Sequence, residues 1–145
     1  MKFITSYKIF ESSQPYNFSY SGKEGAQYIY YFTDEFENKF RVEFDHLPEN
    51  ETEVRYLVKE GDNWTFSKVK SNIFRITETI FGRIIPNFLD KNEWCNMIII
   101  KGLGKSNENS EITQRTKVYW RYLSNNPIDG FSIDRYGNEI YIYRN

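Results

Sequence analysis

The sequence predicts an α+β fold in which a mainly antiparallel sheet packs against two helices. Three observations predict it. Aromatic residues, which favour strands, make up 19% of the 145 residues. Alternating apolar and polar residues dominate the first half of the chain, which is typical of antiparallel hairpins. Over residues 72–90 the apolar residues instead recur every three or four positions, which is typical of an amphipathic helix. The length suits one domain, residues 1–145.

The strands of the first half are joined by turns that contain proline, glycine, aspartate or asparagine. They are predicted at residues 1–10, 16–20, 26–33, 39–45, 53–58 and 64–69. The first is predicted at a sheet edge, and the second ends at Ser21–Gly22. The third and fourth form the clearest hairpin, because Asp34 and Asn38 supply a short connection. The many tyrosines predict rings that are buried at the edge of the core while their hydroxyls find partners.

The helix over residues 72–90 is predicted to begin at a Ser71 cap. Its inward stripe consists of Ile73, Ile76, Ile80, Ile84 and Phe88. Pro86 is awkward in a helix, because it has no amide proton and its ring pushes against Gly82, four residues back. Glycine adds no side chain to that clash, so we expect the helix to bend there and still continue to Leu89.

The second half begins with a short, apolar, β-branched segment at residues 95–100, which predicts a buried strand covered on both faces. After a loop rich in Gly, Lys and Asn, Ser110 is predicted to cap a second helix that ends near Leu123. Its inward residues are Ile112, Tyr119 and Leu123, with Val118 and Tyr122 beside them. A closing hairpin is predicted at residues 130–134 and 139–143.

Composition excludes several classes of protein. The net charge of −1 provides no global field that would hold the chain on DNA, RNA or an anionic membrane. Cys95 is the only cysteine, so no intramolecular disulfide forms, and its apolar neighbours predict a buried, inert thiol. No segment approaches the roughly 18 apolar residues that span a bilayer, and no signal peptide is evident. The expected location is the cytoplasm, or a particle assembled there.

The loop Gly102–Ser106 (GLGKS) invites comparison with phosphate-binding loops. A P-loop needs a glycine five residues before Gly104, where this chain has Ile99. The same loop suggests an acyltransferase-like enzyme that would hold a pyrophosphate there. Glu108 and Glu111 would repel that group. The plain interpretation is a flexible connection, and no cofactor is predicted.

His46 is the only histidine, so no metal site built on several histidines fits within one chain. A general base needs a nucleophile and an orienting group at a defined spacing, and none is evident, so a surface histidine is predicted. Carboxylates gather in turns at Asp34, Glu35, Glu37, Glu49, Glu51 and Glu53. Nothing selects one pair of them for hydrolysis. The sequence therefore predicts no catalytic and no metal-binding residues.

Basic and aromatic residues interleave around the predicted second helix. They form a candidate patch for nucleic acid or another anion at Lys101, Lys105, Arg115, Lys117 and Arg121. Phosphate binding by such a patch would be salt-sensitive, and Trp120 would stack on a base. The plain interpretation is that Tyr119 and Trp120 pack against the sheet while the cations stay solvated. A nucleic-acid-binding module is the first alternative function.

The segments IFRITETIFGRII and RTKVYWRYL, with a strand and a Gly-containing loop between them, resemble a group of small uncharacterised proteins of tailed bacteriophages and Bacteroidetes. Members of that group have preceding hairpins similar to YYF…FRVEF and a following R-x-x-LY element, which Arg115, Val118 and Tyr119 match here. Ile76 and Thr77 replace small residues of the group's helix, and the loop is longer. The resemblance concerns architecture and source, and it implies no established activity.

These observations favour a non-enzymatic interaction or structural protein, encoded by a phage or mobile element. Aromatic residues suit interface anchors, and Trp120 and Tyr122 are the candidate interface residues. The expected partner is a protein, through self-assembly, in a virion or in a host. A virion component and an inhibitor of a host factor both fit, in the host cytoplasm or the virion and without a membrane.

Overall fold

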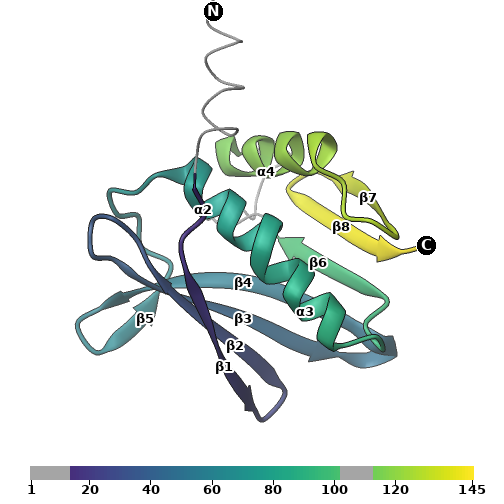
Figure 1. The fold of residues 1–145 in the computed structure, drawn as a ribbon, viewed down its shortest axis with the longest axis horizontal. Helices are drawn as coiled ribbons and strands as arrows, with labels where there is room; N and C mark the ends of the chain where they lie inside the picture. The colour runs from purple at the N-terminus through teal and green to yellow at the C-terminus, as the bar shows by residue number, and fades with distance from the viewer. Residues whose placement is uncertain (1–13, 102–112) are drawn as a thin grey trace, which may run out of the picture.

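The computed structural model describes residues 14–101 and 113–145, and within them eight strands form one sheet (Figure 1). The strands are β1 (Phe18–Glu24), β2 (Gln27–Thr33), β3 (Lys39–Leu47), β4 (Glu51–Glu60), β5 (Asn63–Thr65), β6 (Met97–Lys101), β7 (Phe131–Tyr136) and β8 (Glu139–Arg144). The helical segments are the 3-10 turn η1 (Pro48–Asn50), α2 (Ile73–Thr79), the π-helical turn η2 (Ile80–Ile84), α3 (Ile85–Lys91) and α4 (Gln114–Asn125).

The strand order across the sheet is β1-β2-β3-β4-β6-β8-β7, and β5 pairs with β4 outside this path. Every neighbouring pair is antiparallel except β4 and β6, which the helical crossover α2–η2–α3 connects in parallel. Figure 1 shows α2, α3 and α4 over the same face of the sheet. The predicted α+β fold is therefore confirmed. In the described ranges, no helix combines the length and apolar character that crossing a membrane would require.

The hairpins differ from the prediction mainly at their ends. β2 and β3 confirm the clearest hairpin and pair residue by residue. β1 does not end at Ser21–Gly22. A β-bulge shifts the register between Tyr20 and Gly22, and the strand then continues to Glu24. The chain turns instead at Gly25, whose φ of +61° favours glycine.

Two other predicted strands need correction. The strand predicted over residues 64–69 is only β5, because the chain leaves the sheet after Thr65. At this point the hydroxyls of Thr65 and Ser67 both donate hydrogen bonds to the Glu60 carboxylate, at 2.8 and 2.5 Å. The strand predicted over residues 1–10 lies outside the described residues.

The predicted long helix is present as α2, η2 and α3 in direct succession. Its cap is Asn72 and not Ser71, because the Asn72 side-chain oxygen accepts the amides of Phe74 and Arg75 at 3.1 and 3.2 Å. An asparagine carbonyl at this position satisfies two amides that the first turn leaves unpaired.

Where a bend was predicted, at Gly82 and Pro86, the structure has the π-helical turn η2. The amide of Ile85 donates to the carbonyl of Ile80, one residue further back than in an α-helix. Because Pro86 has no amide proton, the ordinary ladder would be interrupted here in any case. The wider turn therefore lets the helix continue into α3.

β6 lies between β4 and β8, in the interior of the sheet. The prediction that both of its faces are covered was wrong. Ile98 and Ile100 are buried beneath the helices, whereas Met97 and Ile99, on the opposite face, are only half-buried. The apolar run is therefore a one-sided core strand with an apolar outer surface.

α4 begins after Thr113, whose hydroxyl oxygen accepts the amide of Thr116 at 3.2 Å. The predicted cap Ser110 and the predicted core residue Ile112 lie outside the described residues. Tyr119 and Leu123 are buried as predicted. The closing hairpin is confirmed as β7 and β8.

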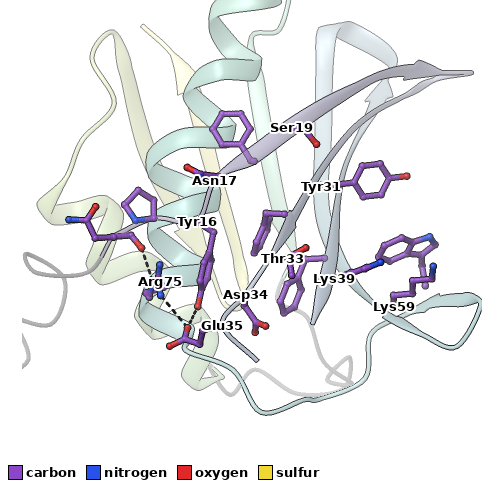
Figure 2. Close-up of a pocket in the computed structure, with 16 residues that line it drawn as sticks. Tyr16, Asn17, Ser19, Tyr31, Thr33, Asp34, Glu35, Lys39, Lys59 and Arg75 are labelled. Carbon is purple, nitrogen blue, oxygen red and sulfur yellow. Dashed lines mark hydrogen bonds and ion pairs between the residues drawn. The ribbon is translucent and has the colours of Figure 1, made fainter. Parts of the chain in front are cut away.

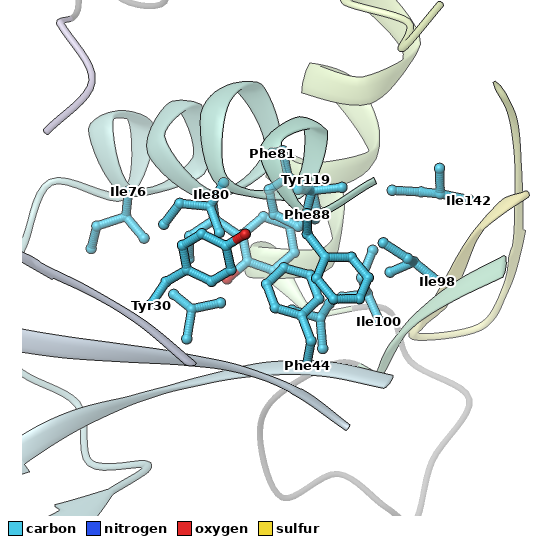
Figure 3. Close-up of a cluster of buried hydrophobic side chains, with 14 of the residues drawn as sticks. Tyr30, Phe44, Ile76, Ile80, Phe81, Phe88, Ile98, Ile100, Tyr119 and Ile142 are labelled. Carbon is cyan, nitrogen blue, oxygen red and sulfur yellow. The ribbon is translucent and has the colours of Figure 1, made fainter. Parts of the chain in front are cut away.

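The core lies between the helices and the inner face of the sheet (Figure 3). Its centre is a stack of Phe44 on Phe88, with ring centroids 4.2 Å apart and ring planes 4° from parallel. Several buried tyrosine hydroxyls have partners, as predicted. Tyr30 donates to the Asn87 side-chain oxygen at 2.8 Å. The hydroxyls of Tyr56 and Tyr119 lie 3.0 Å apart. Such partners offset the cost of burying the polar ends of the rings.

Glu78, on α2, has a side-chain oxygen, Oε2, that is buried without a hydrogen-bond partner among the described residues. Burial raises the pKa of the Glu78 carboxyl, and the nearby Arg83 guanidinium only partly opposes this effect. The ionised carboxylate is therefore a source of instability.

Glu78→Gln is expected to raise the free energy of unfolding at neutral pH. With its raised pKa, the folded protein keeps the Glu78 proton at pH values where the unfolded chain has lost it, so stability falls as pH rises through that window. The advantage of the variant should therefore grow upward from about pH 4 and then level off. Urea unfolding of both proteins across this range measures it. An advantage that is absent, or independent of pH, would contradict the assignment.

Candidate binding surfaces

The outer face of the sheet, which points away from the helices, is divided by an ion-pair network. Glu43 is buried between two guanidinium groups, with its oxygens 2.7 Å from Arg41 Nε and 2.8 Å from Arg55 Nε. Arg55 also lies 3.2 Å from Asp45. On one side of this network, around β2 to β5, lies a groove. On the other side, β6, β8 and β7 present an aromatic surface.

The lysine groove, as we name it, is an open cavity of about 960 Å³ beside the β2–β3 turn (Figure 2). One wall carries Tyr31 and Trp64, whose ring centroids are 5.6 Å apart. Lys39 and Lys59 lie on the same wall. All four come from strand positions that face away from the helices, so the alternation of β2, β3 and β4 and the short strand β5 bring them together.

The two lysines of the groove are cross-strand neighbours. Phe40 pairs with Val58, which places Lys39 next to Lys59 on the adjacent ladder position. Both side chains are exposed. Within the described residues, neither forms an ion pair with a carboxylate, whereas Arg41 is paired with Glu43 and lies 3.6 Å from Glu24. Two lysines without an ion-pair partner among the described residues therefore face the groove.

The opposite wall contains a set of contacts that joins the residues preceding β1 to α2 and to Glu35 (Figure 2). The Tyr16 hydroxyl donates to the Glu35 carboxylate, and the Tyr16 amide donates to Thr79 Oγ1 at 2.8 Å. The Arg75 guanidinium lies 4.1 Å from the centre of the Tyr16 ring and donates to Glu35 at 3.4 Å and to the Gln14 carbonyl at 2.7 Å. Burial, and then the bond to Glu35, raise the pKa of Tyr16.

The carboxylates at the groove are occupied by bonds within the chain. Asp34 is buried and accepts the amides of Phe36 and Asn38 at 2.9 and 2.8 Å, together with the Asn38 side-chain amide at 2.9 Å. Glu35 accepts hydrogen bonds from the Tyr16 hydroxyl and the Arg75 guanidinium. Both carboxylates keep their negative charge, but their bonds are made to groups other than the two lysines, and Glu35 is paired with Arg75.

The second surface, which we name the tyrosine face, is the outer face of β6, β8 and β7. Its members are Met97, Ile99, Tyr136, Tyr141 and Tyr143. Tyr136 and Tyr143 are 69% and 39% exposed, which is high for large rings. The rings of Tyr136 and Tyr141 meet edge to face, with centroids 6.0 Å apart. No helix or strand of the described residues covers this face (Figure 1).

Carboxylates surround the tyrosine face. In the sheet register, Glu51 lies beside Met97 and Glu53 beside Ile99. Asp134 pairs with Tyr141, and Glu139 pairs with Tyr136. The Tyr141 hydroxyl donates to Glu139, and this bond, more than burial, raises the pKa of Tyr141 to about 12. Among the described residues, Lys101 at the end of β6 adds a positive charge beside this face, and its Nζ lies 4.0 Å from Glu53. The rim is therefore predominantly negative.

Of the predicted basic patch, three residues lie on α4, and Lys101 lies at the end of β6. Lys117 and Arg121 lie on the exposed side of α4. The Arg115 guanidinium lies 5.8 Å from the centre of the Tyr56 ring, toward the sheet. Lys101 lies on the outer sheet face, whereas α4 packs on the inner face. Lys105, with the whole loop Gly102–Ser106, is outside the described residues.

The two predicted interface residues have different surroundings. Trp120 is half-buried, and the Arg135 guanidinium lies 5.4 Å from the centre of its ring. Tyr122 is buried and packs against Gly82, so its ring does not lie on the surface where an interface contact would need it. Neither residue belongs to the tyrosine face.

The single cysteine and the single histidine lie apart from both surfaces. Cys95 is buried as predicted, its thiol lies 3.4 Å from Thr52 Oγ1, and burial raises the pKa of that thiol. His46 is exposed and stacks on Trp94, with ring centroids 4.0 Å apart. Among the described residues, no group of three or more His, Cys, Asp or Glu side chains is placed to hold a metal ion.

The aromatic residues and the two lysines of these surfaces were not predicted as binding residues. Alternation within each strand assigns Tyr31, Lys39 and Lys59 to outward positions. It does not show that β5 brings Trp64 beside them. That information lies in the register between strands, which a single strand's pattern does not contain.

Comparison of this chain with protein-family models, with curated proteins and with solved structures finds no match. The resemblance to proteins of tailed bacteriophages and Bacteroidetes stays a prediction.

Proposed function

We propose that this chain is a non-enzymatic interaction protein that binds a protein partner through the tyrosine face. The observation that carries the proposal is the gathering of exposed Tyr136 and Tyr143 with half-buried Met97 and Ile99 on one uncovered sheet surface. Large rings with few rotatable bonds bury much area at a small entropic cost, and tyrosine is enriched at interface hot spots.

The negative rim indicates the chemistry of the partner. Carboxylates surround the rings, so a complementary surface would have an apolar centre and lysine or arginine at its edge. Two copies of this face would place carboxylates against carboxylates, which disfavours self-association through it. The resemblance to phage proteins supports two settings for such a partner: a virion, in which the chain is a component, or a host factor that the chain inhibits.

The test is capture of partners by immobilised protein from lysate of the source organism, with quantification by mass spectrometry. Tyr136→Lys is expected to weaken capture of the specific partner about tenfold or more, because it removes an anchor and adds a charge of the wrong sign. Phe66→Lys is the matched control: Phe66 is also a large exposed ring, at 56%, and lies away from the tyrosine face.

Partners captured equally by the wild type and by both variants would contradict the proposal. So would a protein that stays strictly monomeric by light scattering and captures nothing. Thermal unfolding of each variant verifies that a loss of capture does not come from a loss of fold.

A further inference from the structure

We infer that the lysine groove binds a single strand of nucleic acid, with bases on the Tyr31–Trp64 pair and phosphates beside the two lysines. This inference goes beyond the proposed function, because groove and tyrosine face occupy opposite ends of the outer sheet face. It also differs from the basic patch of the sequence prediction, none of whose described members lines the groove.

The first support is electrostatic. Like charges at neighbouring positions of two strands repel each other, and Lys39 and Lys59 lie one residue beyond the last pair of the β3–β4 ladder, Phe40 with Val58. Within the described residues no carboxylate forms an ion pair with either of them, and the acids at the groove, Asp34 and Glu35, already accept bonds from within the chain. A bound phosphate would supply the missing negative charge.

The second support is aromatic. Tyr31 and Trp64 are half-buried, with part of each ring open to the groove. Base stacking on such rings tolerates any sequence, because every base has a π-face. The guanidinium of Arg41 lies 5.9 Å from the centre of the Tyr31 ring and donates to the Tyr31 hydroxyl at 3.3 Å, which holds that ring in place.

The shape of the groove selects among anions. Its volume, about 960 Å³, is at the upper end of the range of small-molecule pockets, roughly 300–1,000 Å³. The cavity is open to solvent, which leaves room for an extended chain to pass across it. An acidic peptide would use the two lysines but would leave the ring pair without a planar partner. Alternating phosphates and bases would use both.

The experiment is fluorescence anisotropy with a labelled oligothymidylate of about ten nucleotides at several salt concentrations. Lys39→Gln/Lys59→Gln is expected to weaken binding about tenfold and to lower the salt slope by about 1.4, since each phosphate contact on a single strand contributes about 0.7. Trp64→Ala is expected to weaken binding about tenfold while leaving the salt slope unchanged, because it removes stacking and no charge.

Lys117→Gln/Arg121→Gln is the matched control. Like the groove variant, it removes two positive charges, but it removes them from the exposed side of α4. Its affinity for the oligonucleotide should stay within about twofold of wild type. Oligouridylate in place of oligothymidylate distinguishes RNA from DNA as the source of the strand. Thermal unfolding of every variant verifies its fold.

Three results would overturn the inference. The first is that the variant of Lys39 and Lys59 binds the oligonucleotide as tightly as wild type does, or that the wild-type protein does not bind it even at low salt. The second is loss of binding in the α4 variant, which would return the site to the sequence-predicted patch. The third is equal binding of polyglutamate or of duplex DNA, which would show that the groove responds to charge alone.

Discussion

Replacing Phe88 with alanine is expected to lower the free energy of unfolding by about 3–5 kcal/mol. Phe88 and Phe44 are both 0% exposed, and their rings stack at 4.2 Å. Tyr28 and Trp94 contact the edge of the Phe88 ring, at centroid distances of 5.3 and 6.2 Å. Partners from β2, from β3 and from the segment before β6 surround the ring, so the cavity cannot collapse by moving a single element.

Guanidinium unfolding at equilibrium measures this loss, with the slope checked for constancy between variants. Phe66→Ala is the control and should change stability by no more than about 0.5 kcal/mol, because Phe66 is 56% exposed. A loss below about 1 kcal/mol for Phe88→Ala would contradict the packing of α3 on the sheet. Phe88→Leu keeps most of the buried volume and is expected to fall between the two.

Gly82→Ala is expected to destabilise the protein by about 1–3 kcal/mol, although alanine favours helix over glycine by about 1 kcal/mol. A Cβ at residue 82 would lie less than 3.0 Å from the Tyr122 hydroxyl oxygen, a separation that real Cβ atoms essentially never show. Tyr122 is buried in the contact between α4 and the π-helical turn, so its ring has little room to withdraw.

The same substitution should reverse its sign in a Tyr122→Phe background. Without the hydroxyl, the nearest ring atom, Cζ, lies 3.5 Å from the new Cβ, which is ordinary van der Waals contact. The gain in helix propensity then remains, and Gly82→Ala becomes neutral or stabilising by up to about 1 kcal/mol. A double-mutant cycle measures this coupling and subtracts whatever the Tyr122 hydroxyl contributes on its own. Additive effects would contradict the close approach of α4 to Gly82.

The hairpin of β2 and β3 and the helical stripe were predictable because their signals are local. Phe40, Val42 and Phe44 alternate cleanly, and the inward isoleucines recur at helical spacing. An irregularity of the helix before Pro86 was also predictable, since it follows from covalent geometry. Its form was not, because a π-helical turn and a kink relieve the same missing hydrogen bond.

The candidate surfaces were largely beyond sequence reasoning. Lys101 to Arg121 look like one basic patch along the chain, but β6 and α4 place Lys101 and Arg121 on opposite faces of the sheet. Conversely, Lys39 and Lys59 are distant in sequence and become neighbours through the pairing of β3 with β4. Charge along a sequence is a poor guide to charge on a surface wherever strands from separate segments meet.

By itself the sequence determined what each segment becomes: which residues alternate, which form a helical stripe, and where proline and glycine interrupt the pattern. These properties depend on backbone sterics and on residues a few positions apart. Only the tertiary structure decided that β6 pairs in parallel with β4, that Met97 and Ile99 open outward, and that Trp64 joins Tyr31. Those outcomes depend on strand order and register, which minimise the free energy of the whole sheet and leave no mark in any single segment.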